Sequence, residues 1–209
     1  MFKEIEIEKW KRKSTFEFFR NFENPFFNLT AQLEVTNLYR FCKSNNLSFS
    51  LASLFFSIQT VNEITEFRLR IIDGKLVEFD KIHATQTILN DDETFSFCYF
   101  EHAENVFDFN KLGIIAIEKY KKLKTFDVES DRLDLVYYST IPWVAFTGYK
   151  NATRLDDSQT VPRIVSGKLF EDNGRMKLPH SVEVHHSIMD GIHVGKYFNS
   201  LQTKFDNPI

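Results

Sequence analysis

The stretch of sequence that decides the fold runs from Val182 to Gly195, V-E-V-H-H-S-I-M-D-G-I-H-V-G. Its first residues alternate apolar and polar, which is the period of a half-buried strand. Because successive side chains of a strand point to opposite faces, we expect His185 and His186 to face opposite sides at the strand end. Asp190-Gly191 then predicts a turn into a helix. A histidine held at the end of a strand is well placed to act as a general base.

The residues around this stretch predict a mixed α/β protein. Ile164–Phe170 and Lys177–His186 flank Asp172-Asn173-Gly174 and predict a hairpin. The last helix carries apolar residues at i, i+4, i+7 and i+11, from Val194 to Phe205. Strands are also expected at Phe2–Lys9, Leu29–Val35, Ala84–Leu89, Thr94–Phe100 and Leu133–Tyr138, with a hairpin at Phe67–Phe79 around Asp73-Gly74. Helices are expected from a Ser14–Glu17 capping box to about Asn21, from Thr36 to Lys43, and at Leu51–Asn62 and Phe109–Leu123.

This order of elements predicts an α/β (α+β) fold, a two-layer sandwich in which helices pack on a large mixed β-sheet. At 209 residues, we expect a single domain that spans 1–209 and buries a substantial core. The 43% hydrophobic content is ordinary, whereas 23 phenylalanines are many for this length. Aromatic side chains at that density fill a core or line an apolar pocket.

The composition also argues against several classes of protein. The net charge is −3 without a dense basic run, so no nucleic-acid partner is expected. No apolar run approaches the ~20 residues of a membrane span, and the charged first residues predict no secretory signal. Cys42 and Cys98 are far apart and form no CxxC pair, which favours a reduced, cytoplasmic location.

The residues of the histidine motif leave three interpretations open. The histidines could be structural residues at a strand end. His186, Asp190 and His193 would share one face if the segment were helical, which would suit a metal, but the pattern indicates a strand and a break. The third interpretation is acid–base catalysis on a hydroxyl group.

A family resemblance favours catalysis. H-H-S-I-M-D-G at His185–Gly191 resembles the H-H-x-x-x-D-G signature of the CoA-dependent acyltransferases, a group that includes chloramphenicol acetyltransferases, dihydrolipoyl acyltransferases and peptide-synthetase condensation domains. Further segments resemble those of the chloramphenicol acetyltransferases and keep their order and similar spacing: Trp10-Lys11-Arg12, Glu66-Phe67-Arg68-Leu69, Asp73-Gly74, Glu93-Thr94-Phe95-Ser96, Ser139 to Val144, and Gly191-Ile192-His193-Val194. The resemblance covers nearly the whole chain and implies the fold of that family.

The resemblance also implies catalytic roles. His186 matches the family histidine that deprotonates the acceptor hydroxyl, which then attacks the carbonyl of acetyl-CoA directly. Ser139 matches the serine that donates to the oxyanion. Asp190 and Arg12 match an aspartate and an arginine that pair with each other and organise the site, whereas His185 is expected to be structural. No metal and no permanently bound cofactor is implied, and acetyl-CoA is the expected co-substrate.

The binding residues are implied in the same way. Trp143 and Lys168 fall where the family contacts CoA, and Phe18, Phe19 and Phe95 fall where it walls the acceptor pocket. This chain departs from the family at Phe19, where a tyrosine is often found, and at Val165, where a threonine is common. The family fold further implies a homotrimer, in which His186 faces the pocket of a neighbouring subunit.

The sequence therefore leaves three functions open. The first is acetylation of chloramphenicol, with a possible role in antibiotic resistance. The second is the same O-acetyltransferase reaction on another hydroxylated small molecule, which is motivated by the departures at Phe19 and Val165. The third is a non-catalytic protein that binds a hydrophobic ligand.

Overall fold

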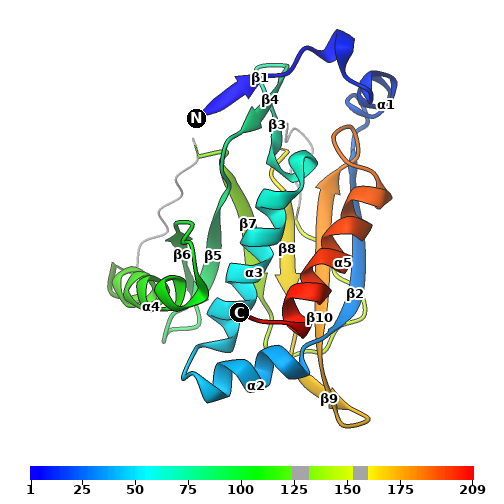
Figure 1. Ribbon diagram of the computed structural model, residues 1–209. Helices are drawn as coiled ribbons and strands as arrows, with labels where there is room; N and C mark the ends of the chain where they lie inside the picture. The colour runs from blue at the N-terminus through cyan, green and yellow to red at the C-terminus, as the bar shows by residue number, and fades with distance from the viewer. Residues whose placement is uncertain (124–131, 153–159) are drawn as a thin grey trace.

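The computed structural model describes residues 1–123, 132–152 and 160–209. A large sheet carries a layer of helices on one face (Figure 1), as the sequence predicts. The strands are β1 (Phe2–Glu4), β2 (Phe26–Glu34), β3 (Leu69–Ile72), β4 (Lys75–Phe79), β5 (His83–Leu89), β6 (Phe95–Phe100), β7 (Leu135–Thr140), β8 (Arg163–Ser166), β9 (Phe170–Asp172) and β10 (Arg175–His185). The helices are η1 (Ile7–Lys9), α1 (Lys13–Phe19), α2 (Thr36–Ser44), α3 (Phe49–Glu63), η2 (Thr65–Arg68), α4 (Val106–Leu123) and α5 (Gly191–Asp206).

The large sheet has the strand order β2-β10-β8-β7-β5-β6, with β9 paired to β10. It is mixed, because β7 runs parallel to both β5 and β8, whereas the remaining pairs are antiparallel. The longest pairing joins β10 to β2, from Lys177 opposite Glu34 to His185 opposite Phe26. This pairing holds the end of β10, and with it the histidine motif, beside the start of β2.

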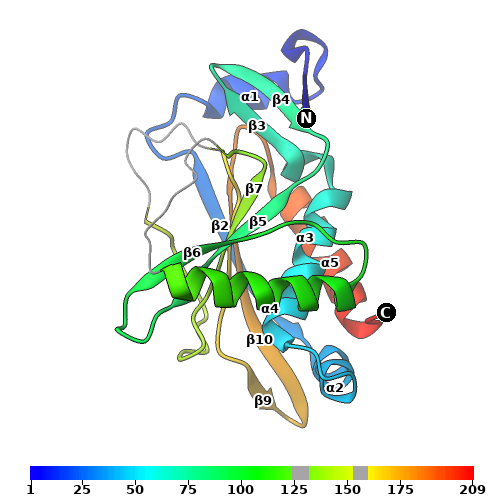
Figure 2. The ribbon, with the colours of Figure 1, turned by 90° about the vertical axis from the view of Figure 1, so that its left-hand side faces the viewer.

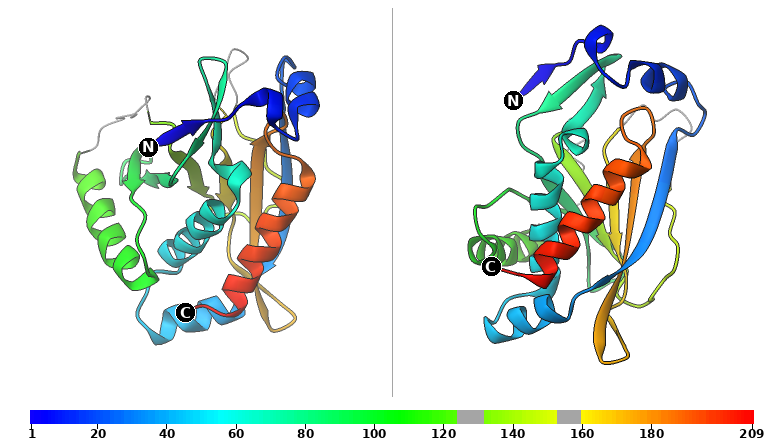
Figure 3. Two further views of the ribbon diagram at one scale, coloured as in Figure 1. Left: turned by 45° about the horizontal axis from the view of Figure 1, so that its top comes forward. Right: turned by 45° about the vertical axis from the view of Figure 1, so that its right-hand side comes forward.

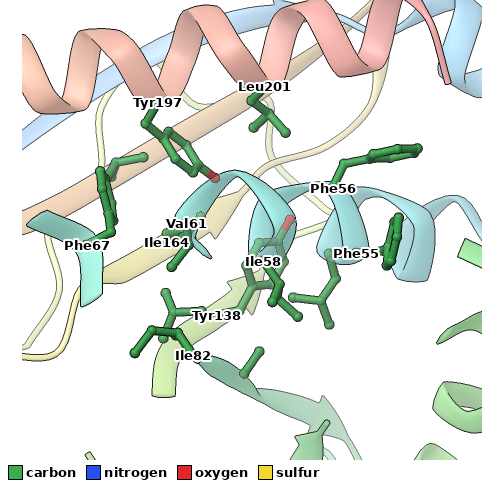
Figure 4. Close-up of a cluster of buried hydrophobic side chains, with 14 of the residues drawn as sticks. Phe55, Phe56, Ile58, Val61, Phe67, Ile82, Tyr138, Ile164, Tyr197 and Leu201 are labelled. Atoms are coloured by element: carbon green, nitrogen blue, oxygen red, sulfur yellow. The ribbon is translucent and has the colours of Figure 1, made fainter. Parts of the chain in front are cut away.

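Helix α3 is the centre of the hydrophobic core. It contacts both α4 and α5, and it is buried from Leu51 to Ile58. Figure 4 shows its phenylalanines and Ile58 among side chains from β7, β8 and α5. Helix α4 approaches closely at Gly113, where an added Cβ would lie 2.8 Å from a methyl group of Leu51. Among the described residues, eight of the chain's 23 phenylalanines are buried in this core.

A buried chain of polar side chains joins the sheet to α5. The hydroxyl of Tyr138 lies 2.6 Å from that of Ser166, which is in turn 3.0 Å from Nδ1 of His180. On the other side of the imidazole, Nε2 of His180 is 3.0 Å from the hydroxyl of Tyr197. Because each buried polar group has a partner, the chain fixes the position of α5 on the sheet.

Acidification is expected to destabilise the protein through its buried histidines. Burial lowers the pKa of His180 to about 3, and burial, followed by the charges of His186 and Arg163, lowers that of His185 to about 4. Below the ordinary histidine pKa of about 6.5, the unfolded chain binds protons that the folded chain does not. The free energy of unfolding should therefore fall by about 1.4 kcal/mol per pH unit for each histidine.

Urea unfolding between pH 7 and pH 5, at one protein concentration, measures this dependence. The variant His180→Gln should start from a lower stability and then lose less of it per pH unit than the wild type. Equal slopes in the two proteins would contradict the assignment of the acid sensitivity to His180.

A second sheet, of three strands in the order β1-β4-β3, was not expected from the sequence. Its β3–β4 hairpin turns at Asp73 and Gly74, whose φ angles of 50° and 77° match the predicted type I′ turn. The fully buried Arg70 attaches this sheet to β7: its guanidinium donates to the carbonyls of Phe67, Leu69, Leu133 and Leu135. Burial lowers the pKa of Arg70 to about 9, so the group remains charged near neutral pH.

Two local predictions at the N-terminus were wrong. The expected strand Phe2–Lys9 ends at Glu4 and continues as the 3₁₀ turn η1, because Ile5 and Ile7 turn inward and pack against the core. The expected capping box at Ser14 is absent, since α1 begins at Lys13 with no side-chain cap. The preceding residue, Arg12, is instead held by the turn after β10.

Other boundaries moved by a few residues. Helix α2 begins at Thr36 rather than after it, and α3 begins after Ser48, whose side chain accepts from the N–H of Leu51. The turn at Asp172-Asn173-Gly174 joins β9 to β10, while β8 pairs with β10 further along.

Figure 2 shows α4 lying along the strands β5 and β6. Among the described residues, no helix is long and apolar enough to cross a membrane.

Candidate active site

The candidate site forms at the turn that links β10 to α5, under α1 (Figure 3, right). The backbone N–H of His186 donates to the carbonyl of Pro25 at 2.7 Å, which ties the start of the turn to the chain before β2. The amides of Ile188 and Met189 both lie 3.0 Å from the carbonyl of His185 and close the turn. The position of His186 is therefore set by the backbone on both sides.

The contacts of its side chain assign the tautomer of His186. Its Nδ1 lies 3.2 Å from the carbonyl oxygen of Met189 and 3.3 Å from Oδ1 of Asp190. Both partners are acceptors, so Nδ1 carries the proton and donates. Nε2 is then the unprotonated nitrogen, with a lone pair available to take a proton. This is the tautomer that a general base needs.

Aromatic rings surround the imidazole of His186. The ring of Phe19, at the end of α1, is stacked on it with a centroid distance of 3.9 Å and an angle of 7°. Phe27 of β2 packs at 4.7 Å. Phe18 and Phe22 continue the cluster around Phe19, and Phe18 remains 64% exposed. The His186 side chain therefore lies among apolar rings and remains one-third exposed.

Arg12 clamps the turn from the other side. Its guanidinium pairs with both carboxylate oxygens of Asp190 and also donates to the carbonyls of Ile188 and His186. Burial lowers the pKa of Arg12, and the negative charge of Glu66 opposes that effect. The ion pair expected between Arg12 and Asp190 is present. Removing one partner of such a partly buried pair would leave the other charge unpaired, at a cost of up to ~3–5 kcal/mol.

His185 faces away from this cluster. It is buried beside Phe26, and its Nδ1 accepts from the hydroxyl of Ser187 at 2.7 Å. Its pKa of about 4 keeps the imidazole uncharged near neutral pH. The two adjacent histidines thus face different surroundings, as the strand pattern predicts.

A second group of the expected residues lies on the opposite face of the sheet. Ser139 follows Tyr138, whose hydroxyl lies 3.4 Å from that of Ser53 in α3, so Ser139 faces away from the helices. The register places Val165 beside Ser139, and Val165 is buried. The hydroxyl of Ser139 is 3.0 Å from that of Thr87 in β5, a neighbour that the sequence did not reveal.

Phe95 shares this outer face. It lies two residues before Phe97, which pairs in register with Thr87. The Phe95 ring packs edge-on against Phe97 at 5.7 Å and is 45% exposed. The segments that carry Trp143 and Lys168 also meet, because the N–H of Lys168 donates to the carbonyl of Val144 at 2.9 Å. Trp143 is 64% exposed and Lys168 is also exposed, so both side chains are accessible.

The two groups are far apart within one chain. His186 contacts Phe27, which packs against the core on the helical face, whereas Ser139 lies on the outer face. Ser139 lies in the same row across the sheet as Val165 and Ser181. From Ser181, His186 is five residues along, about 17 Å, and β7 is two strands across, about 10 Å. One chain therefore does not bring Ser139 close to His186.

Two residues that the sequence did not indicate also contact His186, namely Phe27 and Met189. Phe27 lies before the expected strand Leu29–Val35 and was not predicted as a site residue. Met189 contacts His186 through its backbone oxygen, which any residue would supply. For the metal alternative, His193 points Nδ1 toward the N–H of Asp190 and Nε2 toward Glu66. Within the described ranges, no group of three or more His, Cys, Asp or Glu side chains could hold a metal ion.

Known proteins match both the sequence and the fold of this chain. The family model described as chloramphenicol acetyltransferase matches residues 1–202. The chain belongs to the chloramphenicol acetyltransferase family. Members of this acyltransferase family use acetyl-CoA as co-substrate without a permanently bound cofactor. The resemblance of the motifs from Trp10 to Val194 is thereby confirmed.

Individual relatives match over nearly their whole length. A chloramphenicol acetyltransferase of Clostridium perfringens is 32% identical over 97% of this chain and 94% of its own, and one of Staphylococcus aureus is 31% identical over 99% and 97%. A solved chloramphenicol acetyltransferase structure superposes with a TM-score of 0.87 at 26% identity, covering 97% of this chain and 99% of that one. A dihydrolipoamide acetyltransferase of Azotobacter vinelandii, at 12% identity and a TM-score of 0.69, shares the fold alone.

Proposed function

We propose that this chloramphenicol acetyltransferase-family protein transfers the acetyl group of acetyl-CoA to a hydroxyl of chloramphenicol, with His186 as the general base. The observation that carries the proposal is the tautomer of His186: Nδ1 donates to Met189 and Asp190, so Nε2 is available for a proton. The chain acts as one acyltransferase domain in this proposal, and acetyl-CoA is consumed in each turnover.

The reaction needs the base because an alcohol hydroxyl is too weak an acid to attack a thioester unaided at neutral pH. Nε2 of His186 takes the hydroxyl proton while the oxygen attacks the acetyl carbonyl, and a tetrahedral intermediate forms. When this intermediate collapses, the carbon–sulfur bond breaks and the imidazolium returns the proton to the leaving thiolate. A positioned base of this kind contributes ~10²–10⁴-fold.

The oxyanion of the intermediate requires a hydrogen-bond donor, and we assign that role to Ser139. Removing one such donor costs about 10²–10³-fold in kcat. Thr87, 3.0 Å from the Ser139 hydroxyl, orients it. Arg12 and Asp190 act through His186: the pair holds the carbonyls of the turn and places a carboxylate beside Nδ1.

The site is completed between subunits in a homotrimer. Within one chain, His186 and Ser139 lie on opposite faces of the sheet and cannot reach one acetyl group. If His186 of one subunit faces the outer face of the next, the base meets Ser139, Phe95 and Val165 there. The exposed rings of Phe18 and Phe95 would be covered in such an assembly, which suits apolar surface at an interface.

The substrates would occupy the two sides of this shared site. Trp143 and Lys168 bind CoA in the proposal, since both are accessible and their segments are joined by a backbone hydrogen bond. Phe18, Phe19 and Phe95, with Val165 behind Ser139, form the apolar wall of the acceptor pocket. A cytoplasmic location fits the free, buried thiols of Cys42 and Cys98. In a cell that contains this protein in its cytoplasm, the reaction would confer resistance to chloramphenicol.

A second acceptor is the alternative that a specific observation favours. Phe19 is stacked on His186 and has no hydroxyl to bind a polar acceptor group, and Val165 cannot hydrogen-bond as the family threonine does. Neither change alters the identity of His186, Arg12 or Asp190. A different hydroxylated molecule could therefore be the better substrate of the same chemistry.

Thiol release from acetyl-CoA, followed with chloramphenicol and with a panel of other hydroxylated acceptors, tests both candidates. We expect acceptor-dependent release, with the highest kcat/KM for chloramphenicol. A much higher kcat/KM for another acceptor would replace chloramphenicol as the substrate and retain the reaction. Release with none of the acceptors, together with tight binding of a hydrophobic ligand, would favour the binding protein instead.

A further inference from the structure

Two residues of the family motifs have no part in the mechanism above. Glu66, in the E-F-R-L segment, lies on η2, and His193, in the G-I-H-V segment, lies in the first turn of α5. Oε1 of Glu66 is 3.4 Å from Nε2 of His193. The His193 side chain is 9% exposed and that of Glu66 is 27% exposed, so the contact is largely shielded from water.

The other nitrogen of His193 holds the residue that pairs with Arg12. Nδ1 of His193 accepts from the backbone N–H of Asp190 at 2.9 Å, so Nδ1 is unprotonated and Nε2–H faces Glu66. His193 thus takes the place of the Glu or Gln that completes a capping box at the N-terminus of a helix. Burial lowers the pKa of His193, while Glu66 acts in the opposite direction, and the neutral form is the one that can accept.

The contacts form a continuous path to the base. Glu66 faces His193, His193 holds the backbone of Asp190, and the carboxylate of Asp190 lies 3.3 Å from Nδ1 of His186. The charge of Glu66 also acts on Arg12, which holds the same carboxylate from the opposite side. A displacement at Glu66 would therefore reach His186 through Asp190.

We propose that Glu66 and His193 are positioning residues, which orient Asp190 and thereby keep the Nε2 lone pair of His186 aimed at the acceptor hydroxyl. Neither residue touches substrate. The inference rests on the proposed acetyl transfer and deepens it, since it extends the catalytic support from the Arg12–Asp190 pair to a third element, η2.

The body of α5 has anchors of its own, which separates this role from simple attachment of the helix. Lys204 pairs with Glu63 of α3 at 2.7 Å, and Ser200 donates to the same carboxylate. Tyr197 contacts His180 of β10. Loss of Glu66 therefore frees the first turn of α5 and leaves the rest of the helix attached. Glu63→Gln is the matched control, because it weakens an α3–α5 ion pair without touching Asp190.

Steady-state kinetics with the best acceptor tests the proposal. Glu66→Ala should lower kcat by about 10- to 100-fold, the scale of a misplacement of about 1 Å, with little change in KM for acetyl-CoA or the acceptor. Glu66→Gln keeps an acceptor for Nε2–H and should recover most of the activity. His193→Asn keeps an acceptor for the Asp190 N–H and should fall between the two. Glu63→Gln should leave kcat unchanged.

Unaltered kcat in folded Glu66→Ala would overturn the proposal, and so would an equal loss in Glu63→Gln. If Glu66→Ala does not fold, the same comparison is made with His193→Asn and Glu66→Gln. NMR of ¹⁵N-histidine-labelled protein gives a readout independent of turnover: Glu66→Ala should change the nitrogen signals of both His193 and His186. Unchanged His186 signals would overturn the positioning role, whereas an inactive wild type with these changes would overturn only the proposed reaction.

Discussion

Replacing His186 with alanine is expected to lower kcat by about 10²–10⁴-fold, with KM for acetyl-CoA nearly unchanged. The loss follows from the position of Nε2, which is the unprotonated nitrogen because Nδ1 donates to Met189 and Asp190. Without it the acceptor hydroxyl must attack with its proton in place. Thiol release at saturating substrates measures the effect, and urea unfolding shows whether the variant retains its fold.

A matched control uses a histidine outside the cluster. His102 follows β6, where its Nδ1 lies 3.3 Å from Nζ of Lys81, and His102→Ala should keep full activity. Turnover at the wild-type rate in folded His186→Ala would refute the general base. Because Phe19 and Phe27 pack on the ring, some loss of stability in His186→Ala is expected and does not bear on the mechanism.

Mixing two inactive variants is expected to restore activity if the site is shared between subunits. His186→Ala lacks the base and Ser139→Ala lacks the proposed oxyanion donor, so each homotrimer should be nearly inactive. In mixed trimers, a Ser139→Ala chain supplies His186 to the intact outer face of a His186→Ala chain. With equal amounts and random assembly, roughly a quarter of all sites combine both intact residues in a closed ring of three.

The experiment is done by co-expression or by unfolding and refolding the two variants together, and thiol release is compared with each variant alone. The matched control pairs His186→Ala with Asp190→Asn. These two lesions lie in the same cluster, so no mixed site is intact and activity should stay low. Equal recovery in the control pair, or none in the test pair, would refute a site built from the opposite faces of two subunits.

Much of the fold followed from short-range patterns. Apolar–polar alternation predicted the strand β2, and strands were also expected where β5 and β6 lie. Asp73-Gly74 marked the hairpin because the turn needs positive φ at both positions. The failures occurred where distant contacts outweighed local preference. The strand expected at Phe2–Lys9 stops at Glu4 because Ile5 and Ile7 turn into the core, and nothing nearby in sequence marks that turn.

The candidate site divides in the same way. The motif His185–Gly191 and the resemblance predicted His186 as the base and the ion pair beside it, and the structure brings Arg12, Asp190 and His186 together. Phe27, Thr87 and the link between Glu66 and His193 could not be predicted, because each contact joins elements distant in sequence. The presence of a phenylalanine or a threonine in a strand does not indicate which residue it will contact in the folded protein.

The sequence by itself determined the family, and it named the candidate reacting groups, because chemistry depends on residue type and the motifs keep their order along the chain. Tertiary structure decided which nitrogen of His186 is free, because the acceptors of Nδ1 exist only once the turn after β10 closes. It also decided that Ser139 and His186 lie on opposite faces of one sheet, because side-chain direction depends on strand register. In the proposed homotrimer, the two groups meet in one site only when chains pack together.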